Sequence, residues 1–142
     1  MTRLMSAFTL LIALCVFVPA ASAQQPYTPA RGTAERAAIL NSLRPAIEAQ
    51  LNPPVEFVVR NMSVANGWAF VTVDPQRPGG GKIAFSTTRI TDTSFYDGLT
   101  TYALLKFQTG NWHVIDKVIG PTDVAWEGWA QAYGAPRAIF GY

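Results

Sequence analysis

The sequence predicts an α+β domain, with an N-terminal helix packed on a curved antiparallel sheet of four to five strands and a short C-terminal helix. Three observations support this class. Apolar residues recur at three- and four-residue spacing near the N-terminus, as in an amphipathic helix. Two pairs of segments rich in β-branched and aromatic residues follow, and a short turn joins each pair. A final aromatic segment is bounded by helix start and stop signals.

Residues 1–23 are expected to be a cleaved signal peptide. Arg3 supplies positive charge, residues 4–18 are almost unbroken apolar, and residues 21–23 (Ala-Ser-Ala) place small residues before Gln24. The mature protein would begin at Gln24 and be periplasmic or secreted, with no stable insertion in the membrane. A retained N-terminal anchor is the alternative.

The mature chain is expected to hold a single α+β domain at residues 32–142. Residues 24–31 contain two prolines and no periodicity, so we expect an extended linker there. The first helix begins near Thr33, with Gly32 or Thr33 as its N-cap and Glu35 favourably placed in its first turn.

One apolar stripe runs along this helix. It consists of five aliphatic residues at helical spacing: Ile39, Leu40, Leu43, Ile47 and Leu51. Pro45 lies within the span of the stripe, where it removes one backbone hydrogen bond and clashes with the preceding turn. We therefore expect a kink or a break between Arg44 and Pro45. Residues 52–54 (Asn-Pro-Pro) then end the helix.

Two hairpins are expected to form the sheet. Residues 55–64 and 68–74 are strand-like, and Asn66-Gly67 between them is the preferred pair for a two-residue type I′ turn. A second pair of strand-like segments and its glycine-containing connection show the same pattern: residues 99–107, 112–119 and 108–111.

The chain between the hairpins is expected to be mostly irregular. Residues 75–82 contain three consecutive glycines and indicate a loop. Residues 83–85 are expected to form a short strand fragment. Residues 86–98 are rich in Asp, Ser and Thr, which favour local turns over a strand ladder.

The C-terminal segment predicts a short helix that begins after Thr122 or Asp123 and ends at Gly134. Small and aromatic residues would line one side of it: Ala125, Trp126, Trp129, Ala132 and Tyr133. Aliphatic residues are too few here for a core helix. The segment must therefore dock on the sheet, cover an open edge, or present its rings to a partner.

Composition excludes several classes of function. The only cysteine, Cys15, leaves with the signal, so the mature chain forms no disulfide and offers no nucleophilic thiol. The net charge of +2 is small and no basic cluster is visible in the sequence, so nucleic acid is not an expected partner. One histidine cannot build a histidine-rich zinc site. We expect no metal and no cofactor.

The one catalytic candidate is His113, with Asp116 as a possible orienting carboxylate. A general base needs such a partner and a substrate pocket. Three residues apart on a regular strand, however, the two side chains would point to opposite faces. An ordinary edge or surface histidine is the simpler interpretation.

Two loops offer weaker patterns. Asp92, Ser94 and Asp97 supply oxygen ligands but lack the order of ligands, glycine and terminal glutamate of a calcium-binding EF-hand loop. Arg77 and Lys82 flank three glycines, yet the Ser or Thr and the helix of a phosphate-binding loop do not follow. Both segments are expected to be ordinary turns.

The remaining candidates are the rings of the C-terminal segment. Trp126, Trp129 and Tyr133 could anchor an interface or stack on sugar rings. Alternatively, these rings pack on the open face of the sheet, as aromatic residues do in small domains.

Several segments resemble a set of small exported bacterial proteins that carry only hypothetical-protein names. The similarity lies in residues 54–60 (PVEFVVR), 67–71 (GWAFV) and above all 118–126 (VIGPTDVAW). It implies a single exported domain and provides no catalytic residues. The expected helix-on-sheet plan is also that of cystatin-like and NTF2-like folds, although the inhibitory Gln-x-Val-x-Gly loop of cystatins is absent.

Two classes of function follow from these observations. The first is a non-enzymatic envelope module that binds a protein, peptide or cell-wall glycan through the concave sheet face and the aromatic C-terminal segment. The second is a small NTF2-like enzyme or ligand-binding protein, with a pocket between helix and sheet. A subunit that dimerises through its outer strand or C-terminal segment is a third possibility.

Overall fold

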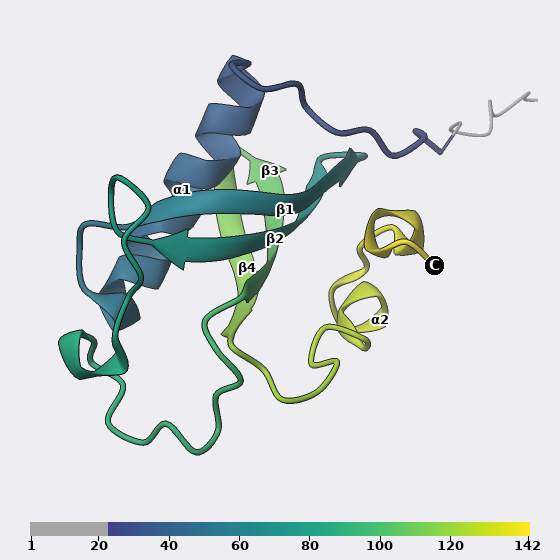
Figure 1. The fold of residues 1–142 in the computed structure, drawn as a ribbon. Helices are drawn as coiled ribbons and strands as arrows, with labels where there is room; N and C mark the ends of the chain where they lie inside the picture. The colour runs from purple at the N-terminus through teal and green to yellow at the C-terminus, as the bar shows by residue number, and fades with distance from the viewer. Residues whose placement is uncertain (1–22) are drawn as a thin grey trace, which may run out of the picture.

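The computed structural model describes residues 23–142 (Figure 1). The four strands form one antiparallel sheet in the order β1-β2-β3-β4, which confirms the α+β class. The elements in chain order are α1 (Ala34–Leu51), β1 (Glu56–Ala65), β2 (Trp68–Gln76), η1 (Phe85–Thr87), β3 (Thr101–Gln108), β4 (Asn111–Ile119), α2 (Trp129–Tyr133) and η2 (Arg137–Phe140). The expected export signal, Ala23 excepted, lies outside the described residues. Within them, no helix combines the length and hydrophobicity needed to span a bilayer.

Helix α1 forms as one uninterrupted element. Thr33 is its N-cap and accepts a hydrogen bond from the backbone nitrogen of Arg36. The break expected at Pro45 is wrong, because helical structure continues through it to Leu51. Pro45 is exposed, as is Asn41, whose carbonyl the proline leaves without its helical partner. Water can therefore solvate that carbonyl, and the buried face of the helix is unaffected.

Both hairpins close through two-residue turns. Asn66 and Gly67 have φ of 51° and 74°, which confirms the type I′ turn between β1 and β2. Thr109 and Gly110 have φ of 50° and 81° and join β3 to β4 in the same way. The second connection is therefore shorter than the four residues that the sequence indicated, because Gln108 and Asn111 already pair across the strands.

The segment between β2 and β3 contains no strand fragment at residues 83–85, so that expectation is wrong. Ile83 is buried, and the chain then forms the 3-10 turn η1.

The segment that leads into β3 makes a close backbone contact at Gly98, which lies against Gly120 at the end of β4. The Gly120 backbone nitrogen donates to the Thr100 carbonyl over 2.8 Å, and its carbonyl accepts from Asp97 over 2.8 Å.

The sheet is covered on both faces. Ile39, Leu43, Ile47 and Leu51 of α1 pack on one face, in a cluster with Val71 and Val73 of β2 among others. The opposite face carries Trp68 and Phe70 of β2, and the C-terminal segment packs there through residues that include Trp129 and Ile139. Figure 1 shows α2 lying well away from α1, which crosses the sheet on its other side. The open concave face expected from the sequence is therefore occupied.

Part of the expected linker, around Tyr27 and Thr28, is held against β1. Tyr27 and Val64 exchange two backbone hydrogen bonds of 3.0 and 2.8 Å. The Thr28 hydroxyl donates to the Met62 carbonyl over 2.8 Å. β1 is an edge strand, because only β2 pairs along its length. Tyr27 and Thr28 therefore supply hydrogen-bond partners for backbone groups at one end of its free edge.

Candidate functional site

The aromatic C-terminal residues largely face the protein. Trp129 is only 7% exposed, and its ring meets that of Phe70 edge-on at 6.4 Å. Trp126 is half-buried and stacks on Tyr102, with ring centroids 3.7 Å apart. Tyr133 is the most exposed of the three predicted binding residues, at 40%. These residues cover the sheet and do not form an open ring surface.

The catalytic candidates lie on the same face of the sheet, contrary to the expectation from sequence spacing. His113 pairs with Lys106 and Asp116 pairs with Leu104, and these two partners are two residues apart on β3. A β-bulge in β4 supplies the extra residue between them. Side chains that sequence spacing alone placed on opposite faces thereby share one.

No hydrogen bond joins His113 to Asp116 among residues 23–142, however. The His113 Nε2 atom lies 3.2 Å from the Gln108 carbonyl oxygen, and the ring is exposed. Asp116 accepts a hydrogen bond of 2.5 Å from the Tyr133 hydroxyl and one of 2.7 Å from the Lys117 backbone nitrogen. The hydrogen bond to Asp116 raises the pKa of Tyr133, because it stabilises the protonated phenol. The carboxylate thus holds the C-terminal segment to β4.

The two weaker loop patterns also have structural roles. Asp92 accepts hydrogen bonds from the backbone nitrogen and hydroxyl of Ser94, which lower the pKa of its carboxyl group. Residues 23–142 contain no cluster of three or more His, Cys, Asp or Glu that could hold a metal ion. Arg77 donates to the carbonyls of Leu51, Asn52 and Pro54 over 2.6–3.0 Å. Its guanidinium therefore caps the end of α1 and is not a phosphate ligand.

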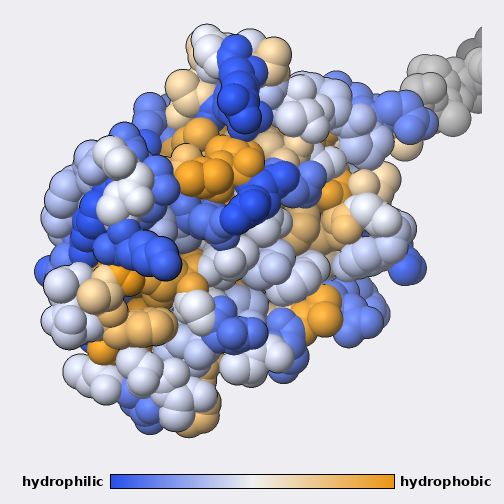
Figure 2. All heavy atoms as spheres, in the orientation of Figure 1, coloured by the Kyte–Doolittle hydropathy of each residue, from blue (hydrophilic) through white to orange (hydrophobic). Residues whose placement is uncertain are grey.

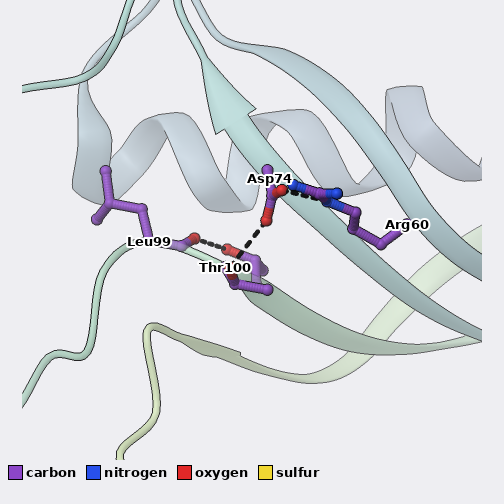
Figure 3. A network of polar contacts seen from close by, with 5 residues as sticks. Arg60, Asp74, Leu99 and Thr100 are labelled. Carbon is purple, nitrogen blue, oxygen red and sulfur yellow. Dashed lines mark hydrogen bonds and ion pairs between the residues drawn. The ribbon is translucent and has the colours of Figure 1, made fainter.

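A polar network centred on Asp74 holds neighbouring segments of the chain together. The carboxylate of Asp74 pairs with Arg60 and accepts a 2.8 Å hydrogen bond from the Thr100 hydroxyl (Figure 3). The network links β1, β2 and the chain entering β3. The Arg60 side chain is 66% exposed, so this ion pair is worth little stability by itself.

A groove lies between α1 and the two hairpin turns. Its volume is about 670 Å³. Small residues of α1 form one wall, the turn glycines Gly67 and Gly110 lie opposite, and aromatic residues complete it. The aromatic and polar residues of the lining are Tyr27, Glu35, Asn41, Ser42, Phe107, Asn111 and Trp112.

Two rings in the groove are available to a ligand. Phe107 is 48% exposed and rests edge-on against Trp112, with ring centroids 5.4 Å apart. Tyr27 is 39% exposed, and its hydroxyl donates to a Glu35 carboxylate oxygen over 2.8 Å. That hydrogen bond raises the pKa of the Tyr27 phenol, because it stabilises the protonated form.

Sequence reasoning missed this groove. The sequence places Phe107 at the end of an expected strand and Tyr27 in the expected linker, and neither position indicates a binding site. The exposure of Phe107 follows from its position next to the turn, where no element covers it. The position of Tyr27 depends on its pairing with Val64, which no local pattern signals. Comparison with protein-family models, curated proteins and solved structures finds no match.

Proposed function

We propose that the protein is an exported, non-enzymatic binding module whose ligand site is the groove between α1 and the hairpin turns. The observation that carries the proposal is the pair of exposed rings, Tyr27 and Phe107, in a groove of about 670 Å³. Pockets of this size, apolar with a few polar groups, are typical ligand sites. The helix-on-sheet plan is analogous to cystatin-like and NTF2-like folds. This analogy concerns architecture alone: a helix that crosses a sheet can leave a ligand site at its margin.

A neutral glycan fits the lining better than a peptide or a charged metabolite. Sugar rings present apolar faces that stack on aromatic side chains, and hydroxyl groups that bond to amides and carboxylates. Asn41, Ser42 and Asn111 supply neutral polar groups, and Glu35 is an acceptor. The lining contains no Lys or Arg to hold an anion.

The contacts of Gln24 are compatible with a mature chain that begins at this residue. The Gln24 side-chain oxygen accepts from the Asn66 backbone nitrogen over 2.9 Å, and the Gln24 backbone nitrogen donates to Asn66 Oδ1 over 3.2 Å. Both contacts persist if the chain starts at this residue. Intact-mass analysis of the native protein from a periplasmic extract or the medium should give a chain of residues 24–142. A protein that keeps Met1 and stays in the cytoplasm would contradict export.

The groove is tested by the loss of one ring. Phe107→Ala should weaken binding of chito-oligosaccharides or soluble cell-wall glycan fragments about fivefold, because ring contacts of this kind are worth roughly 1 kcal/mol. Isothermal titration calorimetry measures the change. Phe95→Ala removes an even more exposed ring, 73% exposed, outside the groove, and should leave the affinity unchanged.

Two results would count against the groove as a glycan site. Equal weakening by Phe107→Ala and Phe95→Ala would show non-specific contact. Binding of peptides in place of glycans, with the same dependence on Phe107, would keep the site and change the ligand class.

The alternative, a small enzyme of NTF2-like plan, has one observation in its favour: the bulge in β4 brings His113 and Asp116 to one face. It is supported less well, since neither residue lines the groove and each already has a different hydrogen-bond partner.

A further inference from the structure

Strand β1 leaves part of its outer edge open. It is the first strand of the sheet, so only β2 pairs along its whole length. Residues 24–28 follow the far end of this edge, through the Tyr27–Val64 and Thr28–Met62 hydrogen bonds, and the chain then turns away to begin α1. Among the described residues, no further segment donates or accepts a backbone hydrogen bond at residues 56–61.

A furrow lined by both apolar and arginine side chains runs beside this open edge. Its volume is about 300 Å³, and it lies between α1 and β1. Its lining residues are Arg31, Arg36, Leu40, Phe57, Val58 and Val59. Val58 is 41% exposed, an unusual value for a valine in a strand. Figure 2 shows hydrophobic surface between α1 and β1, flanked by strongly hydrophilic side chains.

Four arginines surround the furrow and the open edge: Arg31, Arg36, Arg44 and Arg60. Arg36 donates to the Pro29 carbonyl, and Arg44 donates to the Val55 carbonyl. Arg60 pairs with the carboxylate of Asp74. A guanidinium has five N–H donors, so most of their donors remain available. Of the nearby carboxylates, Asp74 pairs with Arg60, while Glu48 and Glu56 contact only uncharged donors and are two further negative charges. The excess positive charge therefore comes from Arg31, Arg36 and Arg44.

We propose that the open edge of β1 binds an extended acidic segment of a partner protein as an added strand. Residues 24–28 already pair with β1 in antiparallel fashion, so the edge accepts an extended chain in this orientation. In this mode of recognition, main-chain hydrogen bonds supply affinity and a pocket for alternate side chains supplies specificity. Here the furrow takes the apolar side chains, and the arginines attract the acidic ones.

Charge argues against a second copy of the chain as the occupant. Pairing of β1 with β1 across a two-fold axis would bring both sets of four arginines to one interface. Like charges placed opposite each other are destabilising. The site is separate from the glycan groove, since the two linings have no residue in common.

A synthetic peptide tests the strand contact directly. The probe is a fluorescent decapeptide of alternating valine and glutamate, titrated with the mature protein in fluorescence polarisation. Two modified peptides are compared with it: one N-methylated on every valine, the other on every glutamate. Alternate N–H groups of an extended chain point to opposite edges, so only one modified peptide should lose affinity, by tenfold or more. Equal behaviour of the two modified peptides would overturn the added strand.

A charge variant tests the arginines. Arg31→Glu should weaken binding of the unmodified peptide roughly three- to tenfold, because it removes one attraction and adds one repulsion at an exposed site. Lys82→Glu makes the same charge change at an exposed position away from the furrow and should have no effect. Equal effects of both variants would overturn the assignment, as would a concentration-dependent dimer in light scattering without peptide. Phe107→Ala should bind the peptide normally, which separates this result from the glycan proposal.

Discussion

Gly120→Ala should destabilise the protein by about 2–5 kcal/mol. Gly120 has φ of +53°, where a residue with a side chain is strained by roughly 1–2 kcal/mol. A Cβ atom there would also lie 2.2 Å from the carbonyl oxygen of Gly98, a backbone atom that cannot turn aside. Forced overpacking of this kind costs about 1–3 kcal/mol more. The shift also disturbs the hydrogen bonds that Gly120 makes with Asp97 and Thr100.

Urea denaturation of the two alanine variants Gly120→Ala and Gly98→Ala measures this effect. Gly98 is the matched control, because it forms the other side of the same contact with φ of +70° and has open space where its Cβ would lie. Gly98→Ala should cost only the backbone strain. If both variants lose the same free energy of unfolding, the close approach of the two backbones does not exist in solution.

Local signals were enough to predict α1 and the two hairpins, whereas α2 begins at Trp129 and not after Thr122 or Asp123. The capping residue Thr33 and the apolar stripe define α1, and the Asn66-Gly67 pair fixes the first hairpin. Each signal depends on residues within a turn or two of one another, so the sequence shows it directly. The effect of Pro45 was mispredicted because it depends on which side of the helix faces water.

The candidate sites depend on contacts that are remote in sequence. The groove needs Tyr27 to reach Val64, and the furrow needs Arg31 and Phe57 to meet across α1 and β1. The bulge in β4 reverses the expected face of Asp116 relative to His113, since one extra residue changes the alternation of a strand. No pattern within β4 itself indicates where that residue is inserted.

Trp129→Ala should cost about 3–5 kcal/mol of folding stability. Trp129 is 7% exposed and packs with Phe70, Leu104 and Ile139 on the face of the sheet opposite α1. Loss of a buried tryptophan removes its transfer free energy and leaves a cavity that the surroundings fill only partly. The C-terminal helix has only five residues, so it has little stability without this packing.

Thermal denaturation of Trp129→Ala and Tyr133→Phe distinguishes a structural from a binding role for the C-terminal segment. Tyr133→Phe keeps the ring and removes only the exposed hydroxyl that donates to Asp116, so it should lower the melting temperature far less. An unchanged melting temperature for Trp129→Ala would mean that the ring is not buried in solution. The segment would then be available as an interface, and the ligand site would have to be sought there. A large loss of melting temperature confined to Trp129→Ala would instead show that this segment is part of the core on the face of the sheet opposite α1. The groove and the β1 edge then remain the proposed binding surfaces.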